Sequence, residues 1–320
     1  MIMEKISKSQ IKLVRSLQMK KFRDETGLFV AEGEKCVEEL RKGFEVEYYI
    51  QTAGADRPAT PDRTQTGLRP DRVLLATPKE IEQMSGLRTP QGVIGVFRKN
   101  ASDDRPATPD RGQTADADRP ACGLTDAKRA IERKTADKQD IILVLDGVQD
   151  PGNLGTIIRT CDWFGVHEIV CSKDTADCYN PKVVQATMGA LARVRVHYTD
   201  LVEWLSPTRP PHEGGEKVRI YGTLLEGENM YEVMRPASPD RAQTGLRPDR
   251  TQTIIVMGNE GNGISAEVRK LITHPIRIPS YPPNGASGQN GKNAERSEVV
   301  ESLNVSIATA IVLAEFRRQE

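Results

Sequence analysis

IILVLDGVQDPGNLGTIIRTCDWFG, residues 141–165, is the clearest structural signal in the chain. The nearly unbroken apolar run Ile141–Val148 predicts a strand of a parallel sheet, because such strands are covered on both faces. Asp150–Asn153 predicts a turn, and Leu154–Phe164 predicts a helix that ends at Gly165. A buried strand that leads directly into a helix is the building unit of α/β folds.

The same alternation continues to the C-terminus. Further strands are predicted at Glu168–Cys171, Arg193–Tyr198, Arg219–Leu225, Thr253–Met257 and Pro275–Pro279. Further helices are predicted at Val183–Ala190, Leu201–Leu205, Ser265–Ile272 and Ser302–Arg318. Because strands that alternate with helices pair mostly in parallel, we expect an α/β domain with a mostly parallel sheet over residues 139–320.

Residues 1–100 predict a second, small α/β domain. It begins with a basic helical pattern at Ser9–Phe22 and has a later helix at Pro78–Met84. Its strands are predicted at Leu28–Ala31, Glu47–Ile50, Arg72–Ala76 and Gly92–Phe97.

A polar element rich in Asp, Arg, Pro and Thr occurs three times, at Ala55–Arg72, Asp103–Leu124 and Arg235–Thr253. None of the three contains Val, Ile, Met, Phe, Tyr or Trp, so they cannot bury enough apolar surface to offset the entropy of ordering. We interpret them as surface insertions, with residues 101–138 as a polar linker. A fourth polar stretch, at about 281–300, predicts a loop.

Charge is balanced over the whole chain, with 45 basic and 45 acidic residues. A nucleic-acid partner would therefore need a local basic surface. The first 23 residues offer one, because they contain a single acid, Glu4, and seven basic residues: Lys5, Lys8, Lys12, Arg15, Lys20, Lys21 and Arg23. We predict that Lys12, Arg15, Lys20, Lys21 and Arg23 contact the phosphates of a nucleic acid; a merely solvated basic helix is the alternative.

Five cysteines, an odd number without a CxxC pair, argue against structural zinc and against a disulfide framework. The first ten residues, MIMEKISKSQ, lack the apolar core of a signal peptide. The longest apolar stretch, around Val305–Ala314, is too short to span a bilayer. We expect a cytoplasmic protein with reduced thiols, without a metal and without a membrane partner.

The predicted helix after the first strand of the parallel sheet carries a polar pair. Its apolar residues share one arc, and Arg159 lies well off that arc, so the core does not need it. Asn153 lies at the helix start, beyond the carboxyl end of a strand, where ligands of open α/β sheets bind. The plain alternatives are a helix cap for Asn153 and a solvated charge for Arg159.

Two further clusters follow towards the C-terminus. In IIVMGNEGNGIS, Ile254–Ser265, a predicted strand runs into three glycines, which allow close approach of a ligand or simply form a tight turn. Glu260 in this loop could bind a ligand hydroxyl or orient Arg159. In Glu301–Gln319, Ser302 is positioned to cap the last helix, and the polar pair Asn304 and Ser306 predicts a buried network or local capping.

In combination, these clusters are far more specific than each is alone. The order N-L-G-T-I-I-R-T, V-M-G-N-E-G-N-G and then I-P with S-L-N-V-S-I-A resembles the SpoU (TrmH-like) family of RNA ribose 2′-O-methyltransferases, over about residues 139–320. Residues 11–35 resemble the substrate-binding domain of many members, which is similar to ribosomal protein L30e. The departure from the family pattern is the longer segment 280–300 between I-P and S-L-N-V-S.

The resemblance implies an S-adenosyl-L-methionine-dependent homodimer that modifies structured RNA, with rRNA favoured over tRNA. It implies a trefoil-knotted sheet domain after an L30e-like one. The donor would be held by Met257, Gly258, Gly263, Ile278, Pro279 and Leu303. The catalytic set would be Asn153, Arg159, Glu260, Ser302 and Asn304.

The role of Arg159 is open between two possibilities. The family proposal makes it the base, but an arginine is very hard to deprotonate. The second role, which we favour, is to contact the neighbouring phosphate and to stabilise the 2′-oxygen as it becomes negative.

Three alternative functions compete with this one. The first is a base methyltransferase with the same fold, against which the Asn153–Arg159 pair argues. The second is a nicotinamide or nucleotide enzyme, which would need an early GxGxxG that is absent here. The third is a non-catalytic RNA-binding protein, which is disfavoured because Asn153, Arg159 and Glu260 are all present.

Overall fold

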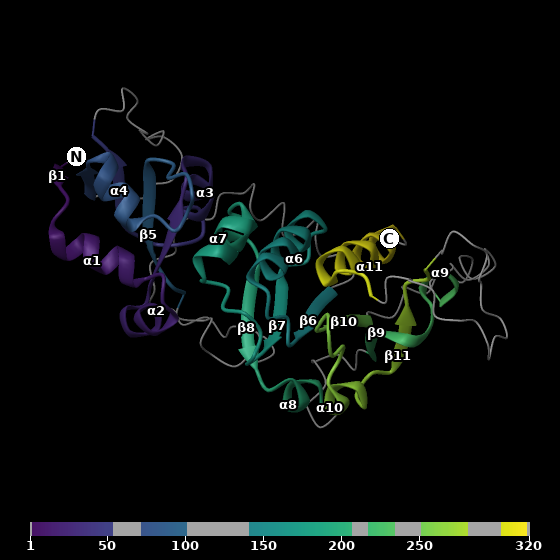
Figure 1. Ribbon diagram of the computed structural model, residues 1–320. Helices are drawn as coiled ribbons and strands as arrows, with labels where there is room; N and C mark the ends of the chain where they lie inside the picture. Colours follow the sequence, from purple (N-terminus) through teal and green to yellow (C-terminus); the bar gives the residue numbers. More distant parts are fainter. Residues whose placement is uncertain are drawn as a thin grey trace, which may run out of the picture. The chain divides into compact units, whose positions relative to one another are not determined.

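The computed structural model describes residues 2–53, 72–100, 141–206, 217–233, 251–280 and 302–318 (Figure 1). The predicted linker and most of each predicted insertion lie outside these ranges, as does Cys122. Two insertion boundaries are wrong by up to three residues, because Arg72 begins a strand and residues 251–253 belong to one. The described chain forms two contact units. Unit 1 takes its residues from 1–104, 147–169 and 174–197, and unit 2 contains the others.

The N-terminal part of unit 1 contains a five-stranded mixed sheet in the order β1-β4-β3-β5-β2. Pairs β1–β4 and β3–β4 are parallel, whereas β2–β5 and β3–β5 are antiparallel. Its strands are β1 (Ile2–Lys5), β2 (Leu28–Glu32), β3 (Val46–Thr52), β4 (Arg72–Ala76) and β5 (Val93–Arg98).

Four helices accompany this sheet: α1 (Lys8–Ser16), α2 (Lys20–Thr26), α3 (Glu34–Leu40) and α4 (Pro78–Met84). The single helix predicted at Ser9–Phe22 is wrong, since the backbone becomes extended at Met19 and divides it into α1 and α2. Both α1 and α4 begin with a capping box. In this motif a Ser or Thr side chain accepts a hydrogen bond from the backbone N–H three residues later, and the side chain of that later residue accepts one from the backbone N–H of the Ser or Thr. Apolar residues of α1 and α4 pack with those of β2–β5 in one core cluster.

The second sheet is an all-parallel six-stranded sheet, in the order β11-β9-β10-β6-β7-β8. The predicted α/β class is therefore confirmed. Its strands are β6 (Ile141–Asp146), β7 (Glu168–Ser172), β8 (Arg195–Thr199), β9 (Lys217–Asn229), β10 (Thr251–Gly258) and β11 (His274–Arg277). Every residue of β6 is buried, as its apolar run predicted, because β6 lies in the interior of the sheet.

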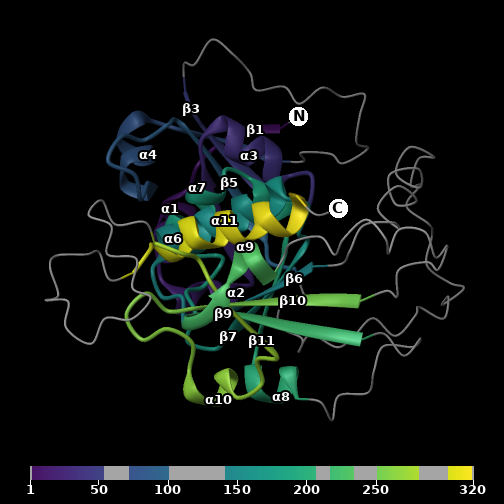
Figure 2. The same ribbon diagram turned by 90° about the vertical axis from the view of Figure 1, so that its right-hand side faces the viewer.

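The helices of this part are α6 (Pro151–Trp163), α7 (Pro181–Thr187), α8 (Leu201–Leu205), α9 (Met230–Val233), α10 (Ala266–Arg269) and α11 (Val305–Arg318), with a 3₁₀ turn at Ala190–Ala192. Figures 1 and 2 both draw α8 and α10 next to each other at one end of the sheet. There Trp204 and Val268 belong to the same core cluster as Ile142 and Ile254 of the central strands. In the described part of the chain, no helix is long and apolar enough to cross a membrane.

The trefoil knot implied by the resemblance concerns the C-terminal part of the chain. Residues 281–301, between β11 and α11, lie outside the described ranges, so the knot stays a prediction.

Candidate functional site

The glycine loop after β10 is a tight turn. Asn259 and Gly263 exchange two backbone hydrogen bonds of 2.9 Å, and the Asn259 side chain accepts hydrogen bonds from the backbone N–H groups of Gly261 and Asn262. Gly263 has a φ of 67°, in the left-handed region. A Cβ on Gly258 would collide with the backbone of Gly263 and Ile264. Both glycines are therefore required by the turn itself, whatever ligand it binds.

Asn304 caps the last helix. Its Oδ1 accepts hydrogen bonds from the Ser306 backbone N–H at 3.0 Å and from the Ser306 hydroxyl at 2.6 Å, and the Ile307 N–H lies 3.4 Å away. The prediction that Ser302 begins and caps this helix is wrong, because α11 begins at Val305 and Ser302 is an exposed residue before it. The side-chain acceptor two residues closer to the helix takes the capping role.

Glu260 joins the glycine loop to this helix. Its Oε1 accepts a hydrogen bond from the Asn304 amide at 2.9 Å and lies 3.4 Å from the Val305 backbone N–H. A carboxylate is favoured at a helix N-terminus, where unpaired N–H groups carry partial positive charge. Asn304 and Ser306 thus both cap the helix locally and join another loop, and the partner, Glu260, was not the one predicted from the sequence.

Asp146 contacts the segment that follows the glycine loop, and the sequence did not predict it as a residue of the site. It is the last residue of β6, it is buried, and its Oδ2 accepts a hydrogen bond of 2.7 Å from the Ser265 backbone N–H. Ser265 directly precedes α10, and its side chain makes no capping hydrogen bond. The sequence signal that could have identified Asp146 is its position as an acidic residue at the carboxyl end of an otherwise apolar strand.

The predicted donor-binding residues lie at or just after the carboxyl ends of β10 and β11, or precede α11. Met257 is buried, Ile278 and Pro279 are partly exposed, and Leu303 is 46% exposed although it is apolar. Carboxyl ends of parallel strands lie at one edge of a sheet, where ligands of α/β folds bind. Exposed apolar side chains beside a tight backbone turn fit a ligand with a flat ring system and polar substituents.

Asn153 and Arg159 lie on α6, which belongs to unit 1. Asp150 caps this helix by accepting the Asn153 backbone N–H at 2.8 Å, so Asn153 is not the cap. Arg159 is exposed, whereas Leu154 and Ile158 of the same helix are buried. Within the described ranges, no carboxylate forms an ion pair with Arg159, so its charge is available to a ligand.

The proposed catalytic residues come from both contact units. Asn153 and Arg159 belong to unit 1, whereas Glu260, Ser302 and Asn304 belong to unit 2. Within unit 2, a hydrogen bond joins Glu260 to Asn304. The assembly of all five residues into one site is a proposal.

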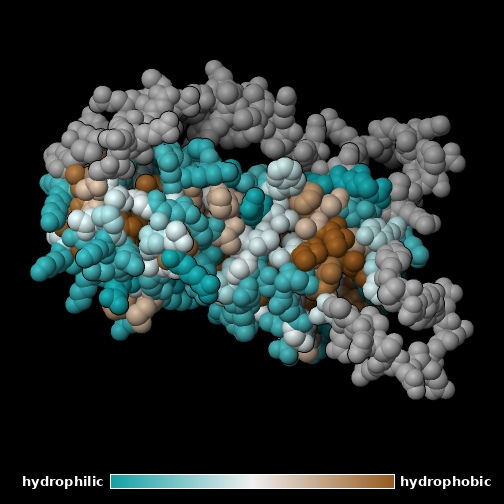
Figure 3. Space-filling view, turned by 45° about the horizontal axis from the view of Figure 1, so that its top comes forward, coloured by the Kyte–Doolittle hydropathy of each residue, from teal (hydrophilic) through white to brown (hydrophobic). Residues whose placement is uncertain are grey.

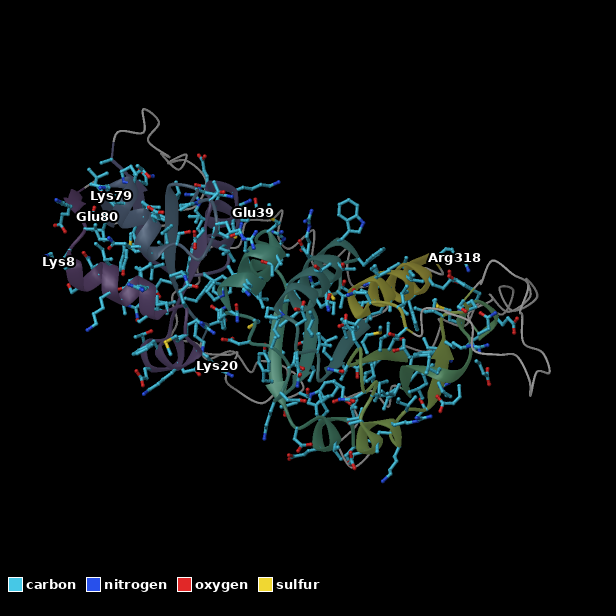
Figure 4. All side chains as sticks on the ribbon, in the orientation of Figure 1. Lys8, Lys20, Glu39, Lys79, Glu80 and Arg318 are labelled. Atoms are coloured by element: carbon cyan, nitrogen blue, oxygen red, sulfur yellow. The ribbon has the colours of Figure 1, made fainter. Side chains whose placement is uncertain are left out.

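A basic surface is formed by α1, α2 and the residues before them. It consists of the exposed Lys5, Lys8, Lys12, Arg15, Lys20 and Lys21. Lys8 and Lys20, labelled in Figure 4, are the first residues of α1 and α2, and neither helix has an acid in its first turn. Since cations at a helix N-terminus are unfavourable for the helix, these lysines are better explained by an anionic ligand than by stability.

Arg23 does not belong to this basic surface, and its prediction as an RNA contact is corrected. Only 1% of the residue is exposed, and its guanidinium forms an ion pair of 2.6 Å with Asp177. It also donates to the backbone carbonyls of Leu17 at 2.8 Å and Gln18 at 3.0 Å. A run of basic residues in a sequence cannot show which member turns inward.

Two family profiles match the chain. The SpoU rRNA Methylase family matches residues 140–286, and the MRM3-like substrate binding domain matches residues 8–95. Together they cover all strands except β1 and the second half of β5, and they leave the linker between the two domains unmatched.

Individual relatives match nearly the whole chain. A TrmH-family structure from Porphyromonas gingivalis is 32% identical, with a TM-score of 0.69, and the match covers 98% of this chain and 99% of that one. An AdoMet-bound rRNA methyltransferase from Sinorhizobium meliloti is 26% identical, with a TM-score of 0.65 and coverage of 99% and 98%. The 23S rRNA (guanosine(2553)-2'-O)-methyltransferase RlmP of Bacillus subtilis is 26% identical over 98% of both chains.

Proposed function

Because the chain belongs to the SpoU/TrmH family, we propose that it methylates a ribose 2′-hydroxyl of ribosomal RNA with S-adenosylmethionine as donor. The observation that carries the proposal is Arg159: an exposed arginine without an ion pair among the described residues, on a helix whose core does not need it. Asn153, Glu260, Ser302 and Asn304 complete the proposed catalytic set.

The donor fits the residues of unit 2. Partly exposed Ile278, Pro279 and Leu303 would hold the adenosyl moiety, and the backbone of the turn at Gly258 and Gly263 would hold its polar groups. When bound, the sulfonium supplies both the electrophilic methyl group and the leaving group.

The protein's own residues perform the remaining work. The Arg159 guanidinium donates hydrogen bonds to the 2′-oxygen and to an adjacent phosphate, which stabilises negative charge as the hydroxyl passes its proton to solvent water. Glu260 holds Asn304 and the first N–H of α11, which keeps the glycine turn fixed against this helix. Alignment of the oxygen with the methyl–sulfur bond contributes several kcal/mol to such a reaction.

The substrate proposal is a guanosine of 23S rRNA. Its support is the likeness to RlmP over nearly the full chain and to other guanosine 2′-O-methyltransferases over about half of it. The test is methyl transfer to 23S rRNA and to tRNA from a strain that lacks this protein, followed by mapping of 2′-O-methyl nucleotides. A new 2′-O-methylguanosine in 23S rRNA alone supports the proposal; a methylated base, or modification of tRNA alone, contradicts it.

We also propose a cytoplasmic homodimer. Ile307, an apolar residue of α11, is 52% exposed, and Figure 3 shows apolar side chains gathered where Figure 1 draws this helix. Cys36 and Cys161 are buried thiols outside any disulfide, which suits a reducing compartment. Sedimentation analysis should give twice the chain mass, and a monomer would contradict the dimer.

The basic surface should bind RNA through phosphates. Replacing Lys20 and Lys21 by alanine is expected to weaken RNA binding and to reduce the slope of log K against log salt by about 1 or more. The measurement is a salt titration of the Kd for an rRNA fragment. Lys270→Ala, which removes an exposed charge next to α10, is the matched control. An unchanged slope in the double variant would exclude this surface.

Gly258 should be essential for donor binding. Gly258→Ala places a Cβ against the backbone of Gly263, so the turn must open, and calorimetry should show at least about a tenfold weaker affinity for S-adenosylmethionine. Gly261→Ala is the control, because its Cβ would meet only the Asn259 side chain at an ordinary distance of 3.4 Å. Equal donor affinities for the two variants would refute the role of this turn.

A further inference from the structure

Arg193 links two helices of unit 1 that lie far apart in the sequence. Its Nε lies 2.9 Å and 3.1 Å from the carboxylate oxygens of Asp162, and its Nη2 lies 2.8 Å from Asp162 Oδ2. Its Nη1 donates to Glu39 Oε2 at 2.7 Å. One planar guanidinium therefore holds α6 on one side and α3 on the other.

The residues around the bridge allow α3 and the α7 segment to pack closely. Gly189, just before the 3₁₀ turn that leads to Arg193, has a φ of 91°, and a Cβ there would collide with the Glu39 side chain. Cys36 of α3 lies against the Val184 carbonyl of α7, with its Sγ at 3.8 Å. The bridge is thus part of a close contact between α3 and the α7 segment, and not an isolated surface pair.

Glu39 and Arg193 both stay ionised at neutral pH. The pKa of Glu39 is lowered, first by the hydrogen bond from Lys42 and also by the one from Arg193. The pKa of Arg193 is raised, chiefly by its hydrogen bonds to Asp162. Neither Glu39 nor Arg193 therefore changes its charge near neutrality and loosens the bridge.

The bridge fixes the orientation of α6 more than it adds to the free energy of unfolding. The Arg193 side chain is 42% exposed, and ion pairs that exposed contribute at most about 1 kcal/mol. Bidentate binding of a carboxylate, in contrast, fixes distance and orientation. On α6, Asp162 lies three residues after Arg159, so the bridge fixes the helix turn that carries the proposed catalytic arginine.

We propose that Arg193 is a positioning residue, which holds α6 and Arg159 in fixed register with the N-terminal sheet that carries the basic surface. RNA bound by Lys20 and Lys21 is then presented to Arg159 at a defined distance. This inference rests on the proposed function.

The test uses full-length protein and 23S rRNA, with Arg193→Ala, Arg193→Lys and Glu39→Gln. We expect kcat to fall about tenfold in Arg193→Ala and partly in the other two, with RNA KM, melting temperature and S-adenosylmethionine affinity nearly unchanged. The double variant Glu39→Gln/Arg193→Ala should lose little more than Arg193→Ala alone. Arg195→Ala, an exposed arginine two residues away, is the control and should retain full kcat.

Two outcomes would overturn the inference. The first is full kcat in Arg193→Ala, which would show that the bridge does not matter for the reaction. The second is a parallel loss of kcat, melting temperature and donor affinity, which would show a merely structural role. Failure of the proposed function is separate, because it would appear as a wild-type protein without methyl transfer to RNA.

Discussion

Arg159→Ala should lose at least about a hundredfold in methyl-transfer rate, the scale of losing one hydrogen-bond donor to a developing oxyanion. The loss should appear in kcat, measured by single-turnover transfer to rRNA with saturating donor. Melting temperature should stay nearly unchanged, because the side chain is exposed and has no ion pair among the described residues. Near-normal turnover would remove every catalytic role of this residue.

Arg159→Lys separates the two roles that the sequence left open. A lysine keeps the positive charge but gives up the planar fork, and its proton is much easier to remove than that of arginine. If Arg159 stabilises the oxyanion and a phosphate, this variant should recover part of the rate without a new dependence on pH. If the residue acts as the base, the lysine variant should gain a rising pH profile near the pKa of its amine. Arg195→Ala serves again as the control for loss of an exposed arginine.

Local signals predicted most of the parallel sheet and its helices. Leu201–Leu205 and Pro78–Met84 are helices with the predicted bounds, and β6 is the buried strand that its apolar run indicated. Each of these elements has a clear local pattern of apolar residues or a helix-capping residue next to it in the sequence. By contrast, β1 and α3 were missed, because β1 has only four residues and α3 has no clear start signal.

The site was predicted where its residues are neighbours in the sequence and missed where they are not. The polar pair at the start of α11 was recognised, although the cap is Asn304 and not Ser302. Asp146 was missed because its partner, the Ser265 N–H, is 119 residues away. Arg23 was misassigned because its ion-pair partner is 154 residues away and only tertiary structure turns the side chain inward.

Asp177→Ala should strongly destabilise the protein. It leaves the Arg23 guanidinium buried without its counter-charge, which costs about 3–5 kcal/mol when one member of a buried pair is removed. For a protein of this size, the melting temperature should fall by about 6–20 °C. Differential scanning calorimetry measures this, with Asp174→Ala as the control, since Asp174 is exposed in the same loop.

The buried position of the pair explains why the loss should be large. Asp177 Oδ2 accepts hydrogen bonds of 3.1 Å and 2.6 Å from Arg23, and Asp177 Oδ1 accepts the Tyr179 backbone N–H at 3.0 Å. The Tyr179 ring packs on Phe29 of β2 with 4.7 Å between the ring centroids. The loop that carries Asp177 therefore also contacts the N-terminal sheet through this ring. Asp177→Asn keeps an acceptor but no charge, and its stability should lie between those of wild type and Asp177→Ala. A free energy of unfolding for Asp177→Ala within about 1 kcal/mol of the wild-type value would contradict this prediction, because an unpaired buried charge costs more. It would mean that the Arg23 guanidinium has reached water and that the ion pair does not hold this loop on the sheet.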